Sequence, residues 1–182
     1  MSRLFASTMA VYARNHASAP EIVACFRDQR NLLVRLAFWI TADEALAEQA
    51  VAQACEITLR GSSPFRDWLL EWAKAATITS AISLHGNALR MCEAKYKDRR
   101  CSHLEHPCQL DDGRRAASLA LILQMDYQKV IAVLDPLCRA VLVLRIAIRS
   151  SIKDCSIRLN VSRAAVLAAN CQAMSWLDHC HI

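Results

Sequence analysis

The densest group of side chains that could do chemistry lies in a polar stretch near the middle of the chain. Its cysteines and histidines are Cys92, Cys101, His103, His106 and Cys108. Thiolates and imidazoles are the ligands that zinc prefers, but zinc motifs usually contain a Cys-x-x-Cys pair, and this stretch has none. We therefore predict a linker without a metal, with a zinc site as the alternative. The Asp-His-Cys-His string at 178–181 raises the same alternative, and we interpret it as a solvated chain end.

Compact catalytic motifs are absent from the sequence. It contains no Gly-rich phosphate-binding loop, no nucleophile elbow and no HExxH pair. Its nine cysteines are scattered and odd in number, which favours reduced thiols in a cytoplasmic protein over a disulfide framework. We therefore expect a protein that is not an enzyme, holds no cofactor and acts by binding partners.

The C-terminal third has a positive net charge, which makes it the candidate DNA-binding part of the chain. The net charge is +5, and basic residues outnumber acidic ones after residue 118, whereas the two balance over residues 1–89. Lys and Arg bind phosphates, and amide side chains read base edges. The candidate DNA-binding residues are Arg149, Lys153, Arg158, Arg163, Asn170 and Gln172.

Local helix signals place most of these residues on a helix-turn-helix. Ser151 and Asp154 have the spacing of a capping box and begin a short helix. This helix stops at Asn160, a residue that tolerates a left-handed backbone, and Ser162 then caps a second helix. Two helices joined by so tight a turn form the unit that lays its second helix in the DNA major groove.

The composition favours an all-α fold for the whole chain. Of 182 residues 54% are apolar, but only three are Gly and four are Pro, too few turn residues for a many-stranded sheet protein. Helical spacing predicts one long helix over 20–40 and a second over 45–59, begun by a capping box of Thr41 and Glu44. A third is expected from Ser63-Pro64 to Gly86, then helices over 116–134 and, after Asp135-Pro136, over 137–148.

These elements predict two small helical domains joined by a polar linker. We place an N-terminal extension at 1–19, a helical bundle at 20–89, the linker at 90–117 and the helix-turn-helix domain at 118–182. An organellar targeting peptide is the alternative for the extension, because it carries Arg3 and Arg14 and no acidic residue precedes Glu21. The longest apolar run, 141–148, is interrupted by Arg145, so we expect no membrane partner.

Several strings of residues carry a family resemblance. They are EIVACFR at 21–27, AEQAVAQA at 47–54, FRDWLL at 65–70, LDPLCRAVLVLR at 134–145 and NVS at 160–162. In this order they resemble RNA polymerase sigma factors of the extracytoplasmic-function type. The first three are similar to the opening helix, the polymerase-binding helix and the Phe-Arg-x-Trp-Leu signature of region 2, and the last two to region 4.

The resemblance implies a region 2 domain that binds RNA polymerase core and a region 4 domain that binds promoter DNA. The polymerase-binding residues that it implies are Glu48, Gln49, Val51, Ala52 and Gln53. By the same analogy Phe65, Trp68 and Trp72 would stack on melted bases, whereas their helical spacing alone predicts that they are core residues.

Two hypotheses follow for the function. The first is a diverged sigma factor that binds polymerase core, directs promoter recognition and transcription initiation, and has an anti-sigma factor as a further partner. The second is a sigma-like protein-interaction module that has lost promoter binding, because Arg163 is the only basic residue of the last helix. A third alternative, an organellar or metal-sensing regulator, depends on the N-terminus and the linker cysteines.

Overall fold

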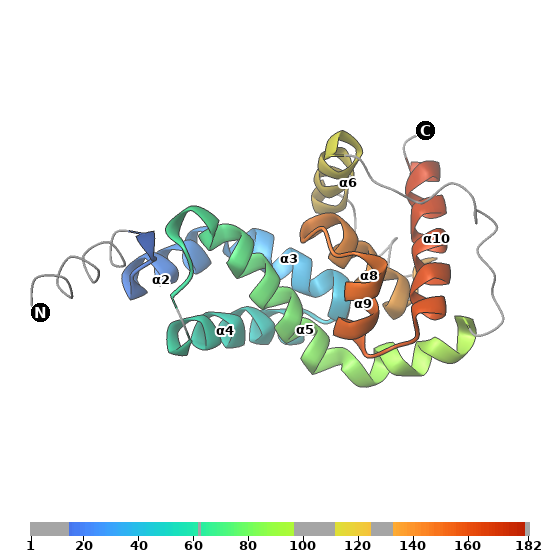
Figure 1. Cartoon of the computed structure of the whole chain (residues 1–182), viewed down its shortest axis with the longest axis horizontal. Coiled ribbons are helices and arrows are strands. Elements are labelled where there is room, and N and C mark those ends of the chain that lie inside the picture. Colours follow the sequence, from blue (N-terminus) through green and yellow to red (C-terminus); the bar gives the residue numbers. More distant parts are fainter. Residues whose placement is uncertain (1–14, 62, 97–111, 125–132, 181–182) are drawn as a thin grey trace, which may run out of the picture.

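The computed structural model describes residues 15–61, 63–96, 112–124 and 133–180. The fold is all-α, as the composition predicts, and the described residues contain no β-strand. The molecule is elongated, with α2 and α4 towards one end of its long axis and α10 towards the other (Figure 1).

In the described residues, the N-terminal half contains three shorter helices and one long helix. The three are α2 (Ala19–Asp28), α3 (Arg30–Thr41) and α4 (Glu44–Arg60). A short 3-10 turn, η1 (Arg66–Trp68), leads into the long helix α5 (Leu69–Glu93), which ends in a second turn, η2 (Ala94–Tyr96). The buried face of α5 carries small side chains such as Ala73, Thr77 and Ala81, so α3 and α4 approach it closely.

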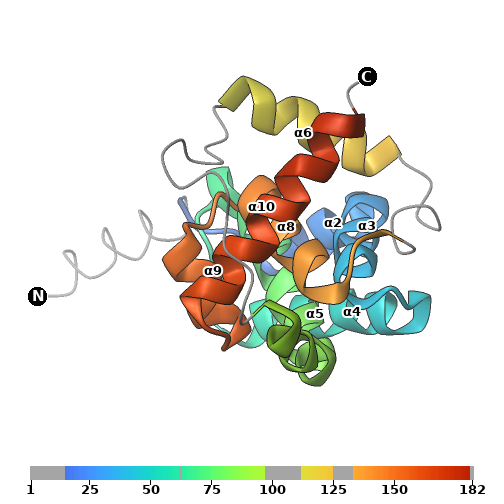
Figure 2. The same cartoon turned by 90° about the vertical axis from the view of Figure 1, so that its right-hand side faces the viewer.

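The C-terminal half surrounds one buried helix. The helices described in this half are α6 (Asp112–Gln124), α8 (Pro136–Ala147), α9 (Ile152–Leu159) and α10 (Arg163–Cys180). Every residue of α8 from Leu137 to Leu144 is buried, because α3, α5, α6, α9 and α10 all pack against it. Figure 2 shows α10 crossing in front of α8, with α6 above them. The predicted start of α8 is confirmed, since the Asp135 carboxylate accepts the Cys138 amide at 3.0 Å.

One hydrophobic core runs across the predicted domain boundary. The larger cluster of buried side chains contains Trp39 of α3, Ile78 of α5 and Leu142 of α8. A smaller cluster, which contains Ile22 and Phe26, lies in the N-terminal half. Among the described residues, the two predicted domains therefore contribute buried side chains to one shared core.

Buried polar contacts join the same two halves. The guanidinium of Arg139, only 3% exposed, donates from Nε to the Trp39 carbonyl at 2.9 Å and from Nη1 to the Leu134 carbonyl at 2.6 Å. Because the Trp39 carbonyl lies in the last turn of α3, where intrahelical donors run out, Arg139 acts as its cap. The Trp39 indole donates to the Ile122 carbonyl at 3.3 Å, and its ring meets Trp176 edge-on with 6.1 Å between centroids.

Two helix limits in the N-terminal half differ from the prediction. Gln29 (φ −100°, ψ 11°) leaves the helical conformation and divides the predicted 20–40 helix into α2 and α3, although no Gly or Pro marks the break. Thr41 ends α3 and is not the cap of α4. That cap is Asp43, whose carboxylate accepts the Leu46 amide at 2.9 Å.

Helix α5 is longer than its sequence signals predict. It continues through Gly86 because Leu89 and Cys92 are buried in the core shared with the C-terminal half. The predicted linker at 90–117 therefore includes the end of α5 and the start of α6. Its residues 97–111 lie outside the described part of the chain, as do residues 1–14 of the predicted extension.

The prediction of reduced cysteines is confirmed at most of the described positions. Burial raises the pKa of the Cys155 thiol to about 11, which keeps it protonated and unreactive at neutral pH. Cys171 is disulfide-bonded, so the prediction is wrong at that residue. The described cysteines that form no disulfide bond are Cys25, Cys55, Cys92, Cys138 and Cys155.

Candidate nucleic-acid interface

Helices α9 and α10 form the predicted helix-turn-helix. The Ser151 hydroxyl accepts the Asp154 amide at 3.1 Å, and the Asp154 carboxylate accepts the Ser151 amide at 3.1 Å. The Ser151 hydroxyl also donates to the Asp154 carboxylate at 2.6 Å, and this hydrogen bond, together with the one from the Ser151 amide, lowers the pKa of Asp154. Asn160 ends α9 in the left-handed conformation (φ 52°, ψ 48°), and the Ser162 hydroxyl accepts the Ala165 amide at 3.3 Å at the start of α10. Each local signal of the motif is confirmed.

Side-chain contacts fix the angle between the two helices. The Ser156 hydroxyl donates to the Val161 carbonyl at 2.7 Å, and the Val161 amide donates to the Ser156 carbonyl at 3.2 Å. Behind the turn, Leu159 and Val166 are at most 2% exposed and close α9 onto α10. The turn is thus held from both sides, and it fixes the positions of the polar side chains that it carries.

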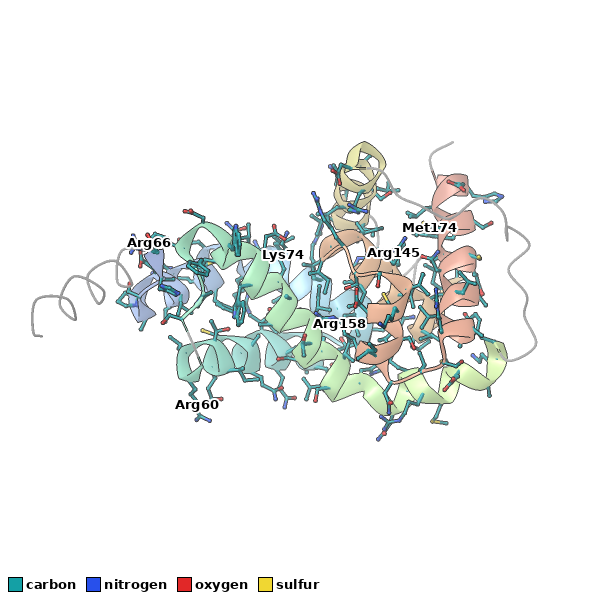
Figure 3. The ribbon with its side chains drawn as sticks, in the orientation of Figure 1. Arg60, Arg66, Lys74, Arg145, Arg158 and Met174 are labelled. Carbon is teal, nitrogen blue, oxygen red and sulfur yellow. The ribbon has the colours of Figure 1, made fainter. Side chains whose placement is uncertain are left out.

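Three of the predicted DNA-binding cations lie exposed on this motif. Lys153 and Arg158 belong to α9, and Arg163 is the first residue of α10; Figure 3 labels Arg158. None of the three forms a salt bridge within the described ranges. Arg149 is also exposed, but its Nη1 lies 3.3 Å from Asp112 Oδ1, so it faces α6 at the edge of the motif.

The two predicted base-reading amides do not join these cations. Asn170 is 1% exposed, which places it out of reach of a base edge, and its Oδ1 has no hydrogen-bond partner among the described residues. Gln172 is half-buried, and its Oε1 accepts the Tyr96 hydroxyl at 3.2 Å. Helical spacing on α10 explains both positions, because Asn170 falls on the face that carries Val166 and Ala173 into the core.

The exposed stripe of α10 is poor in hydrogen-bonding groups. It includes Ala164, Leu167 and Ser175, and Arg163 is the only Lys or Arg of the helix. Such a face offers few donors to phosphates or bases. The cations of α9 therefore supply most of the positive charge of the motif.

The predicted polymerase-binding residues divide between the surface and the core of α4. Gln49 and Ala52 are exposed, whereas Val51 is 7% exposed and packs in the smaller cluster. Glu48 forms a salt bridge with Arg30 of α3. Gln53 is half-buried. Only part of the predicted set therefore lies on the open side of α4.

Two grooves border these surfaces. One of about 690 Å³ lies beside α3 and α4 and includes Arg30, Glu44 and Glu48 in its lining. The other, of about 450 Å³, lies between α5, α6 and α8, and Lys74 and Arg149 are among its charged residues. Carboxylates and cations nearly balance in both linings, so neither groove has a strong preference for ligand charge.

An exposed aromatic patch is the feature for which the prediction from helical spacing fails. We call Phe65, Trp68 and Trp72 the aromatic patch; they are 48%, 66% and 49% exposed. The predicted core position is thus wrong for all three. Phe65 meets Trp68 edge-on, with 5.7 Å between ring centroids. The missed signal is the helical spacing of the small residues Ala73, Thr77 and Ala81, which lie on the buried face of α5 and leave Trp72 outside it.

The described residues were also compared with the requirements of a metal site and of a membrane span. Within the described ranges no three metal-ligating side chains come together, and the predicted alternative ligands Cys101, His103, His106 and Cys108 lie outside those ranges. No described helix combines the length and the apolar character that crossing a membrane requires. Compared with known proteins, the chain matches no family model, no curated protein and no solved structure.

Proposed function

We propose that this chain is a diverged sigma-like factor, which binds RNA polymerase core and promoter DNA and catalyses no reaction. The observation that carries the proposal is the capped helix-turn-helix with Lys153, Arg158 and Arg163 exposed on it. Cations on a rigid motif neutralise phosphates and set its position on a duplex. The proposal places the protein in the cytoplasm, with an anti-sigma factor as a further partner.

The open side of α4 supports the polymerase part of the proposal. Gln49 and Ala52 lie exposed on it, and Glu48 is available at its edge. The Glu48 side chain is 37% exposed even in its salt bridge with Arg30, so a basic partner surface can compete for it. We expect the purified protein to co-elute with bacterial core polymerase, and Gln49→Arg to weaken that complex.

The DNA part is tested with paired charge removals. Lys153→Ala with Arg163→Ala should weaken binding to a duplex and lower the slope of log affinity against log salt by about 2, because each lost phosphate contact removes roughly one released counterion. Arg27→Ala with Arg60→Ala is the matched control, since it removes two exposed cations from α2 and α4. Equal slopes for the two variants would contradict the proposal, as would the absence of any transcription from polymerase loaded with the protein.

A second candidate function is a sigma-like protein-interaction module without promoter binding. It is favoured by the exposed stripe of α10, where Ala164 and Leu167 occupy positions that a DNA reader needs for donors. The two candidates differ in one result. A module binds core polymerase or another protein, yet shows no salt-dependent affinity for DNA.

A further inference from the structure

The end of α5 contacts the start of α10 through one hydrogen bond. Oε1 of Glu93 accepts a hydrogen bond from the Ser162 amide at 2.7 Å, although the two residues are 69 positions apart in the sequence. In a capping box this amide is satisfied by an acidic residue three positions further along the same helix. That position is Ala165 here, so a carboxylate from another helix takes its place.

A buried tyrosine fixes the carboxylate-bearing segment. Tyr96 of η2 is 1% exposed, and its hydroxyl contacts the Asp135 carboxylate, the Cys138 sulfur at 2.9 Å and Gln172 Oε1 at 3.2 Å. These partners belong to the start of α8 and to α10 itself. We call Glu93 and Tyr96 together the clasp. Figure 1 shows the end of α5 passing beneath α9 to reach the lower end of α10.

The clasp occupies the part of the motif that DNA would need. In a helix-turn-helix the first turn of the second helix approaches the base edges, and amides at a helix start bind phosphates. The Glu93 carboxylate already accepts the Ser162 amide, and its negative charge repels an incoming phosphate. Tyr96 holds Gln172, the one predicted base-reading amide that is not fully buried.

We propose that the clasp is an autoinhibitory contact, in which Glu93 and DNA phosphate compete for the start of α10. The proposal rests on the proposed DNA-binding function and adds its regulation. The chain then exists in a closed form, described here, and an open form in which the end of α5 has left α10. Only the open form binds DNA at full strength, so the measured affinity is lowered by the fraction of closed molecules.

The test compares three single substitutions in the full-length protein. Glu93→Gln keeps an oxygen that can accept the Ser162 amide but removes the charge, and Glu93→Ala removes both. Glu56→Gln is the matched control, because it also removes one carboxylate and lies exposed on α4 in a salt bridge with Arg60. Fluorescence anisotropy with a labelled random-sequence DNA duplex should give a Kd about fivefold tighter for Glu93→Ala, the worth of one hydrogen bond. The gain should be smaller for Glu93→Gln, which loses only the charge, and the Kd should be nearly unchanged for Glu56→Gln.

A second readout follows the clasp without relying on affinity. Hydrogen–deuterium exchange of the peptide over 160–166 should be faster in Glu93→Ala than in the wild type. Adding duplex to the wild type should speed exchange over 89–96, because the released end of α5 loses its contacts. Tyr96→Phe removes the hydroxyl alone and should show a smaller gain in affinity. Thermal unfolding followed by circular dichroism verifies that each variant is folded.

The outcomes separate failure of the clasp from failure of the proposed function. If every variant binds the duplex and the Glu93 variants bind no tighter than Glu56→Gln, the clasp is only a helix cap and the inference is overturned. If no variant binds the duplex, even though exchange over 160–166 shows that Glu93→Ala has opened the contact, then the proposed DNA-binding function is wrong. The proposed competition between Glu93 and phosphate is then wrong as well.

Discussion

The aromatic patch and the helix-turn-helix are both exposed, but among the described residues the Lys and Arg side chains near the patch are paired in salt bridges and those on the helix-turn-helix are not. Arg66, labelled near the α2 end in Figure 3, is beside the patch and paired with Glu21, their Nε and Oε1 atoms 2.9 Å apart. Lys74, further along α5, is paired with Glu71. On α9 and α10, in contrast, Arg158 and Arg163 form no salt bridge within the described residues. Neutralised charge beside bare aromatic rings suits a protein partner, whereas unneutralised cations suit phosphate.

The described part of the chain therefore carries two kinds of candidate binding surface, one apolar with paired charges and one with unpaired cations. The core that contains Trp39 and Leu142 connects the elements behind both surfaces. The following substitutions test whether this core connects the two surfaces, and whether the charges beside the aromatic patch are paired.

The largest effect is expected from a matched pair of tryptophans. Trp39→Ala opens a cavity in the shared core and should lower the free energy of unfolding by about 3–5 kcal/mol. Trp68→Ala removes the same side chain from the aromatic patch, where it is 66% exposed, and should change stability by less than about 0.5 kcal/mol. Urea unfolding followed by circular dichroism measures both. Similar losses for the two variants would contradict the assignment of the patch to the surface.

The next effect concerns the polar connection between the halves. Arg139→Met leaves the Trp39 and Leu134 carbonyls without their donors, which lowers the free energy of unfolding. Because the variant no longer has to bury a charged guanidinium, part of that loss is offset, and the net decrease should be about 2 kcal/mol. Arg139→Lys should recover part of the stability, since one ammonium can reach one carbonyl. Arg27→Met, at a 74% exposed side chain, is the control. If Arg139→Met were as stable as the wild type, Arg139 would not stabilise the end of α3.

A smaller, pH-dependent effect is expected at the base of the aromatic patch. Hydrogen bonds from Ser18, together with Arg66, lower the pKa of Glu21 from its ordinary 4.5 to about 2. A lowered pKa contributes stability that is fully present above pH 4.5 and is lost as the pH falls towards 2. Glu21→Gln should therefore have a lower Tm than the wild type at pH 7, and the gap should close between pH 4.5 and 2. A difference in Tm that stays constant between pH 4.5 and 2 would contradict the pairing of Glu21. The control is Asp67→Asn, which removes a nearby carboxylate that forms no salt bridge among the described residues.

The smallest effect is expected when the patch is made polar. Trp68→Ser with Trp72→Ser should leave affinity for a random-sequence duplex unchanged and reduce binding of a hydrophobic fluorescent dye, because the rings carry the apolar area of that surface. A weaker affinity for duplex would show instead that the patch belongs to the nucleic-acid interface.

Local signals in the sequence were sufficient where a few neighbouring residues decide the conformation. Ser151, Asp154, Asn160 and Ser162 satisfy backbone groups within their own turns, so the helix-turn-helix could be predicted. Asp135 is a further example, at the start of α8.

Other features depend on tertiary packing and left no local trace. The continuation of α5 through Gly86 depends on burial of Leu89 against distant helices, and the contact of Glu93 with Ser162 joins residues far apart in the chain. The burial of Asn170 and Val51 was missed because the faces of α10 and α4 that pack inward are set by neighbours, not by polarity.

The length of α5 has a mechanical consequence. Its 25 residues make a rod of about 37 Å, with Trp72 near one tip and Glu93 at the other. One continuous helix therefore joins Trp72 of the aromatic patch to Glu93 of the clasp, and between them it packs against α3, α4 and α8. A displacement at either end would have to be absorbed by those packing contacts.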